Sequence, residues 1–114
     1  MNKKDRALFV LKEFLRIMNL KEYEKATEII TATDIGDIVE LPSFLKEYIQ
    51  GTVEENGFDT IDLFCERNYF SVDDTFETKV AIEYVLSADN GNELPLCVRI
   101  EVTDKDTYLS IMPC

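Results

Sequence analysis

Large apolar side chains occupy every second position in two segments in the second half of the chain. The apolar positions are Val80, Ile82, Tyr84 and Leu86 in residues 78–87, and Leu96, Val98, Ile100 and Val102 in residues 95–103. A period of two predicts a pair of strands, and Asn90-Gly91 between them predicts a hairpin turn. A sheet with one buried face is therefore the main constraint on how this chain can fold.

The length of this first turn predicts which residues face each other. An odd-length loop centred on Gly91 sets Tyr84 opposite Val98 and Glu83 opposite Arg99. In that register the two apolar faces coincide, and the two opposite charges form a cross-strand pair. The sequence therefore predicts an antiparallel pair of strands whose buried face is continuous across both.

A second turn, at residues 104–107, extends the sheet to a third strand. Two central residues in this turn would set Val102 opposite Leu109 and Ile100 opposite Ile111. Both apolar residues of the third strand then join the buried face, whereas an odd-length loop would expose them.

The first half of the chain has the spacing of α-helices instead. Apolar side chains recur every three or four residues in residues 5–18 and again, over a shorter stretch, in residues 21–31. A third helix is expected at residues 43–56, with Ser43 as its N-cap. The apolar face expected for this helix consists of Phe44, Leu45, Tyr48, Ile49 and Val53.

Helices followed by strands are typical of an α+β fold. We expect a single domain over residues 1–114, with two or three N-terminal helices on one face of a three- to four-stranded antiparallel meander. The strands are expected at residues 60–66, 78–87, 95–103 and 107–112. The uncovered face, where a partner could bind, is expected to carry Lys79, Ala81, Glu83, Val85, Cys97, Arg99, Glu101, Tyr108, Ser110 and Met112.

Charge is distributed unevenly along the chain. Residues 1–25 hold seven basic and four acidic side chains, whereas residues 26–114 hold five basic and nineteen acidic ones, for a net charge of −11 overall. Binding to nucleic acid or to an anionic membrane is excluded as the main role, because that attraction requires clustered Lys and Arg. The field attracts a basic protein or a cationic ligand, unless the acidity serves only solubility.

The densest acidic region predicts a partner-binding site. Its residues are Asp59, Asp62, Glu66, Tyr69, Phe70, Asp73, Asp74 and Glu77. Tyr69 and Phe70 are expected in a loop, where an aromatic side chain between acids can be central to a protein interface. Phe70 could equally fill the edge of the core. No metal is expected. Calcium loops place oxygen ligands at alternate positions around a central glycine, and residues 73–77 have neither feature.

Catalysis is not predicted. The 114 residues contain no histidine, which removes the commonest general base and the commonest transition-metal ligand. None of the serines lies in a nucleophile-elbow sequence, and the four glycines form no phosphate-binding loop. We therefore expect a binding protein that is not an enzyme and that needs no cofactor.

The three cysteines and the hydropathy predict a cytoplasmic protein. Cys65, Cys97 and Cys114 have no metal-type spacing, and an odd number suits free thiols in a reducing cytosol. Cys65 and Cys97 are expected to be structural thiols. No apolar run approaches the roughly 18 residues that a membrane span needs, and no export signal is expected.

A short acidic chain with helices before an antiparallel meander, and without a catalytic constellation, resembles the small immunity proteins of bacterial toxin–immunity pairs. These include the proteins of contact-dependent inhibition and of other polymorphic-toxin systems. The resemblance rests on size, charge and element order over the full length. It implies a protein that binds one cognate toxin domain, often a basic nuclease, and blocks its active site or a partner surface.

The element order is also similar to a cystatin-like or NTF2-like layout, which fits either an immunity role or ligand binding. Two alternatives therefore stay open. One is a module that binds a small molecule or a peptide in a pocket between helices and sheet. The other is an interaction subunit that dimerises through the uncovered sheet face, and the sequence does not decide between a monomer and a homodimer.

Overall fold

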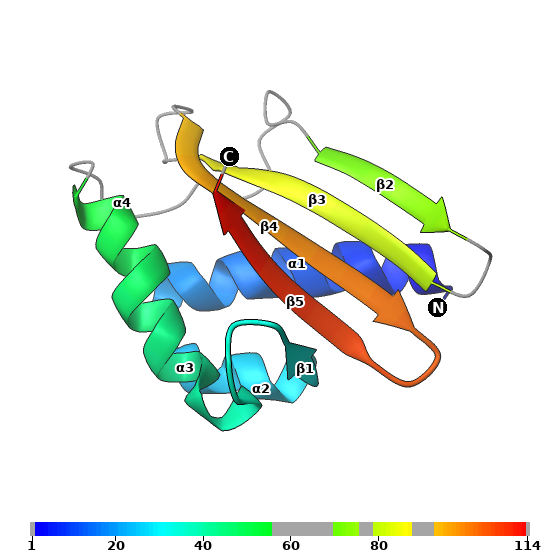
Figure 1. The fold of residues 1–114 in the computed structure, drawn as a ribbon, viewed down its shortest axis with the longest axis horizontal. Helices are drawn as coiled ribbons and strands as arrows, with labels where there is room; N and C mark the ends of the chain where they lie inside the picture. Colours follow the sequence, from blue (N-terminus) through cyan, green and yellow to red (C-terminus); the bar gives the residue numbers. More distant parts are fainter. Residues whose placement is uncertain (1, 56–69, 76–78, 88–92, 114) are drawn as a thin grey trace.

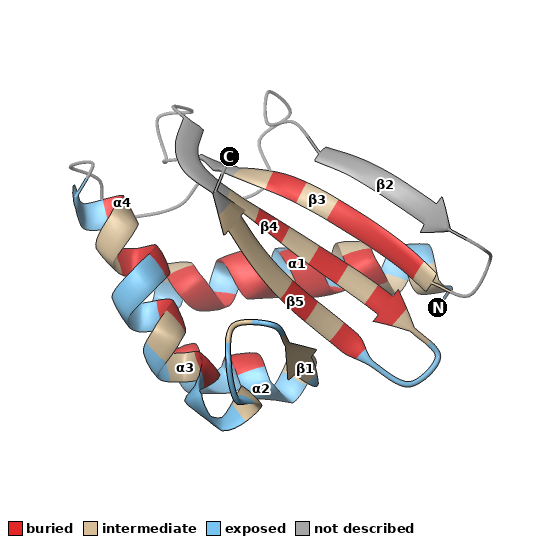
Figure 2. Cartoon of the chain, viewed as in Figure 1, coloured by how far each residue is buried: buried red, intermediate tan, exposed pale blue. Residues whose placement is uncertain are grey.

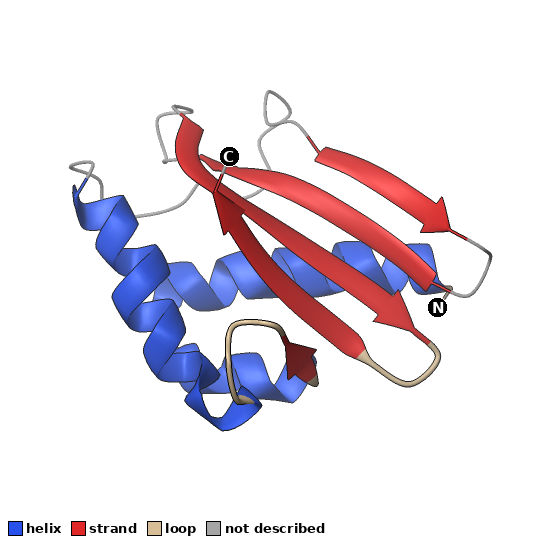
Figure 3. Cartoon of the chain, in the orientation of Figure 1, coloured by secondary structure: helices blue, strands red, loops and turns tan. Residues whose placement is uncertain are grey.

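Helix α1 (Lys3–Leu20) lies across one face of a five-stranded sheet whose strand order is β1-β5-β4-β3-β2 (Figure 1). The computed structural model describes residues 2–55, 70–75, 79–87 and 93–113. The strands are β1 (Ala32–Thr33), β2 (Phe70–Thr75), β3 (Lys79–Ser87), β4 (Glu93–Thr103) and β5 (Thr107–Pro113). Helices packed on one face of a sheet confirm the α+β fold (Figure 3).

The first helix is longer than its apolar pattern indicates, because both of its ends are capped. The Asn2 side chain accepts a hydrogen bond from the backbone N–H of Asp5 at 2.8 Å and so starts the helix. Lys21 takes the left-handed conformation, with φ 59°, and ends it. The buried face of α1 consists of Ala7, Val10, Leu11, Phe14, Leu15, Ile17 and Met18.

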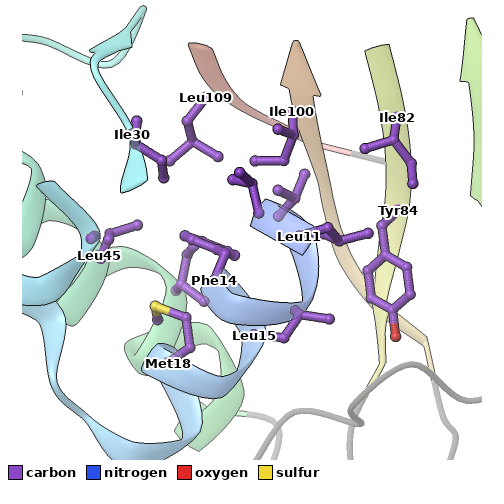
Figure 4. Close-up of a cluster of buried hydrophobic side chains, with 14 of the residues drawn as sticks. Leu11, Phe14, Leu15, Met18, Ile30, Leu45, Ile82, Tyr84, Ile100 and Leu109 are labelled. Carbon is purple, nitrogen blue, oxygen red and sulfur yellow. The ribbon is translucent and has the colours of Figure 1, made fainter. Parts of the chain in front are cut away.

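This face of α1 forms the centre of the hydrophobic core. Leu11 and Phe14 are fully buried and point toward Ile100 and Leu109 of the sheet (Figure 4). Leu45, from a helical segment that follows later in the chain, packs in the same cluster. Burying a side chain of this size stabilises the fold by about 1.5–3 kcal/mol, so α1 holds the sheet and the other helices together.

Two further helical regions follow α1. The first is shorter than the predicted helix 21–31 and consists of the 3₁₀ turn η1 (Tyr23–Lys25) and α2 (Ala26–Ile29). The second, which we call the long helical segment, consists of consecutive pieces that span residues 38–55. These are η2 (Ile38–Glu40), α3 (Leu41–Phe44), the π-helical η3 (Leu45–Gln50) and α4 (Gly51–Glu55).

The predicted N-cap of the third helix is wrong. The side chain of Asp37 accepts from the backbone N–H of Val39 at 3.2 Å, so the helical segment begins at residue 38 rather than at Ser43. Pro42 lies in the first turn of α3, where its missing N–H costs nothing. The carboxylate of Asp37 therefore provides the cap.

The pairing of β3 with β4 is the predicted one. Tyr84 lies opposite Val98 and Glu83 opposite Arg99. The Arg99 and Glu83 side chains form an ion pair of 2.6 Å. Buried residues alternate with partly exposed ones along β4 and β5, which leaves one face of these strands buried under α1 (Figure 2). Ala81 is the exception on the outer face, since only 1% of it is exposed.

The pairing of β4 with β5 is shifted by two residues from the prediction. Leu109 lies opposite Ile100 instead of Val102. The cause is a turn of the same length that lies one residue earlier: the backbone N–H of Thr103 donates to the carbonyl of Asp106, and the Thr103 hydroxyl accepts from the backbone N–H groups of Lys105 and Asp106. A shift of two keeps Leu109 on the buried face, so the predicted faces are correct although the partners are wrong.

Two short strands at the sheet edges were not predicted. β1 pairs in parallel with β5, so the sheet is mixed rather than purely antiparallel. β2 pairs with β3, which places Phe70 in a strand rather than in the predicted loop. The strand predicted at residues 60–66 lies outside the described residues.

The cysteine prediction is wrong for Cys97, which is disulfide-bonded. Since the chain has only three cysteines, its partner is Cys65 or Cys114, both outside the described residues. The bond joins β4 to another part of the chain.

We predict that the unreduced protein exposes one reactive thiol per chain under denaturing conditions and three after reduction. A disulfide uses two of the three sulfurs, so alkylation followed by mass spectrometry should show one added group and then three. Three added groups without reduction would show that the disulfide does not form.

Candidate functional site

The described part of the chain contains only some of the predicted partner-binding residues. Phe70, Asp73 and Asp74 belong to the six-residue edge strand β2, where they pair with Tyr84, Ala81 and Val80 of β3. The other five predicted residues, Asp59, Asp62, Glu66, Tyr69 and Glu77, lie outside the described residues. The structure therefore brings three of the eight onto one strand at the end of the sheet farthest from β1.

The helices carry a second acidic surface that the sequence analysis missed. Residues 22–55, which we call the acidic helical unit, contain nine acidic and two basic side chains, a net charge of −7. One of the two bases, Lys25, pairs with Glu22 at 2.6 Å. Eight of the acids are exposed, namely Glu24, Glu28, Asp34, Asp37, Glu40, Glu47, Glu54 and Glu55.

Apolar side chains are exposed within this acidic surface. Val39 is 79% exposed and Tyr48 is 44% exposed, both on the long helical segment. The Tyr48 ring stacks on that of Phe44, with ring centroids 5.1 Å apart and an angle of 20° between the planes. A stacked aromatic pair on a segment that also carries exposed carboxylates combines the two features that protein interfaces use, apolar area and charge.

The predicted apolar face of this helix is wrong at Tyr48. Leu41, Leu45, Ile49 and Val53 are buried at intervals of four residues, and this row faces α1 and the sheet. Tyr48 lies off that row and faces outward. The strict interval of four was the signal in the sequence that could have separated Tyr48 from the core.

A pocket of about 760 Å³ lies between η1 and the long helical segment. Its charged and polar lining comes from the C-cap of α1, from η1, and from α3, η3 and α4. These residues are Lys21, Tyr23, Glu24, Ser43, Lys46, Glu47, Gln50 and Glu54. A volume of this size is in the range of sites that hold organic ligands or side chains of a partner.

The pocket wall contains two buried polar side chains. Gln50 is 5% exposed, and its Nε2 donates a hydrogen bond to Glu54 Oε1 at 3.5 Å. Tyr23 is 7% exposed, and burial raises its pKa above the usual value for tyrosine. The nearby charge of Glu54 raises the pKa of Tyr23 further. Tyr23, Gln50 and Glu54 therefore form one cluster.

The π-helical piece η3 supplies three of the lining residues, Lys46, Glu47 and Gln50. A π-helix adds a residue to the turn and shifts the side chains that follow it around the axis. Such segments are rare and occur often at functional sites. The apolar row at residues 45 and 49 remains buried through η3, while its polar side faces the pocket.

The outer face of the sheet, unlike the acidic helical unit, carries charges of both signs that form ion pairs. Lys79 pairs with Glu101 at 2.7 Å, and Arg99 pairs with Glu83 at 2.6 Å. These four charges cancel within the sheet, so the face contributes little field of its own. Of the described segments, the acidic helical unit carries the largest net negative charge, −7, compared with −2 for Asp73 and Asp74 of β2.

Within the described ranges, no group of three or more Cys, Asp or Glu side chains is arranged to hold a metal ion. Along the same residues, no helix has the length and apolar character needed to cross a membrane. No protein-family model matches the sequence, and neither the curated proteins nor the solved structures compared with it contain a match.

We predict that Glu54→Gln lowers the pKa of Tyr23 but leaves it above the usual value, because burial is the larger cause and the charge of Glu54 the smaller one. NMR titration of ¹³C-labelled tyrosine, assigned with Tyr23→Phe, measures this pKa. Glu28→Gln, on α2 and outside the pocket lining, is the control and should leave the pKa unchanged. Equal effects of the two variants would contradict the cluster.

Proposed function

We propose that this chain is a non-catalytic immunity protein that binds a basic toxin domain and neutralises it by covering its active site. The acidic helical unit carries this proposal, because it combines a net charge of −7 with a stacked aromatic pair of which Tyr48 is 44% exposed. Phe44 and Tyr48 would provide the apolar centre of the interface. The carboxylates around them would match the basic surface that a nuclease needs for its own substrate.

The mechanism separates into two steps. In the first, the negative field of the acidic helical unit attracts the basic toxin and raises the association rate, an effect that salt weakens. In the second, Tyr48 enters a recess on the toxin and loses its remaining contact with water. A buried tyrosine at an interface centre contributes about 2 kcal/mol or more to affinity, which mainly slows dissociation.

The residues predicted from the sequence offer a second surface for the same function. Asp73 and Asp74 lie on β2, at the sheet edge opposite β1. Asp59, Asp62, Glu66, Tyr69 and Glu77, predicted for the same site, lie outside the described residues. The helical unit is preferred because eight of its carboxylates and the ring of Tyr48 are exposed.

The compartment is also part of this proposal. A nuclease toxin acts where nucleic acid is, which would place its immunity protein in the cytoplasm. The disulfide of Cys97 favours an oxidising compartment instead, because cytosolic reductants keep most thiols reduced. Alkylation of the thiols inside intact cells, before lysis, distinguishes the two locations.

The test begins with a search for a toxic domain encoded beside the gene for this protein. We predict that co-expression of the chain restores growth to cells that express that domain, and that the two purified proteins form a stable complex. Persistent growth arrest in the presence of folded protein would contradict the proposed function.

In the purified complex, Tyr48→Ala should raise Kd at least about tenfold, because it removes the apolar centre of the interface. Phe9→Ala is the matched control, since Phe9 is 51% exposed but lies on α1, outside the acidic helical unit. It should change Kd less than about twofold. Equal effects of the two substitutions on Kd would show that the aromatic pair is not part of the interface.

Charge reversal separates the two acidic surfaces. Glu28→Lys with Glu40→Lys should slow association and increase Kd, most strongly at low salt. Asp73→Lys with Asp74→Lys changes the net charge equally and should have the smaller effect. A larger effect of the Asp73→Lys, Asp74→Lys variant would show that the binding surface lies on β2.

A further inference from the structure

We propose that the pocket between η1 and the long helical segment receives one arginine side chain of the toxin. This inference rests on the proposed function, since it names the group that the partner inserts. Its structural basis is separate from the exposed aromatic pair, because Phe44 and Tyr48 do not line the pocket.

The charge of the pocket fits a single cation. Three carboxylates, those of Glu24, Glu47 and Glu54, line it together with the ammonium groups of Lys21 and Lys46. The lining therefore has a net charge of −1, which one positive group neutralises. A toxin that is basic enough to bind nucleic acid has many such groups on the surface that must be covered.

The lining favours a guanidinium group over an ammonium group. Gln50 is buried and donates a hydrogen bond of 3.5 Å to Oε1 of the exposed Glu54, which orients that carboxylate at the pocket. A carboxylate can accept two parallel N–H groups from the planar guanidinium of arginine. Tyr23 lines the same pocket but is only 7% exposed, so the carboxylates rather than its ring carry the preference for a planar guanidinium group.

The protonation state of Tyr23 agrees with this geometry. Burial and the charge of Glu54 both keep the phenol protonated, so at neutral pH it adds no second negative charge beside the carboxylate. The volume of about 760 Å³ is larger than a lone ion requires. It leaves room for the side chain together with adjacent backbone of the partner.

The first experiment uses the full chain and a probe that mimics one residue. Acetyl-arginine-methylamide is titrated into the ¹⁵N-labelled protein, with the isosteric but neutral acetyl-citrulline-methylamide as its control. The arginine probe should shift the amide signals of Tyr23, Gln50 and Glu54 with a Kd on the order of 1 mM, as expected for a single side chain. The citrulline probe should not shift these amide signals.

Pocket variants test whether these shifts arise from the lining. Glu54→Gln and Glu47→Gln should each weaken binding of the arginine probe at least about fivefold. Such a loss corresponds to a change of about 1 kcal/mol in binding free energy. Glu28→Gln should not weaken it, since Glu28 is exposed outside the pocket. Equal shifts with citrulline, or shifts that Glu54→Gln leaves unchanged, would overturn the proposal.

The second experiment uses the toxin and separates this inference from the proposed function. Glu54→Gln should raise the Kd for the toxin at least about tenfold, and Asp5→Asn, which removes an exposed charge of α1 outside the acidic helical unit, less than about twofold. A toxin that binds both variants equally would overturn the arginine pocket and leave the proposed function standing. No binding of toxin to the wild-type protein, with the arginine probe still bound, would overturn the proposed function instead.

The strength of probe binding distinguishes a partner side chain from a free ligand. A Kd below about 10 µM for the arginine probe would exceed what one side chain contributes to an interface. That result would overturn insertion by a partner and assign the pocket to a free guanidinium compound.

Discussion

The packing of α1 across the sheet is the interaction on which the other parts of this molecule depend. Leu11 and Phe14 are fully buried between the strands and the remaining helices. Truncating a side chain of this kind costs about 3–5 kcal/mol, a large part of the stability of a small domain. Because α1 covers one sheet face, the other face and the outer sides of the helices are left for binding.

The acidic helical unit takes its position from the same core. Leu41, Leu45 and Ile49 on the long helical segment are buried together with Phe14. This row holds the segment beside η1, so the pocket lies between them and Tyr48 stays outside. One face of the segment thus stabilises the fold, while the opposite face presents carboxylates and an aromatic pair. The division explains how a helix can be well packed and still offer a binding surface.

Local periodicity predicted the strands well and the binding surface poorly. The alternation from Val80 to Val102 determined both the faces and the pairing of β3 with β4, since charge and hydrophobicity agreed on one register. The register of β5 depended on hydrogen bonds of the Thr103 hydroxyl within the turn. Such bonds cannot be predicted from the spacing of apolar residues. The pocket depends on a π-helical turn and on the approach of η1, both consequences of tertiary packing.

Hydrogen exchange of the free protein and of its complex with the cognate toxin tests the central claim most directly. The claim is that the acidic helical unit is the surface that the toxin covers. Binding should slow amide exchange in η1 and in residues 38–55, and should leave β3, β4 and β5 unchanged. Slowed exchange confined to Phe70–Thr75 or to the other strands would contradict it, because the interface would then lie on the sheet.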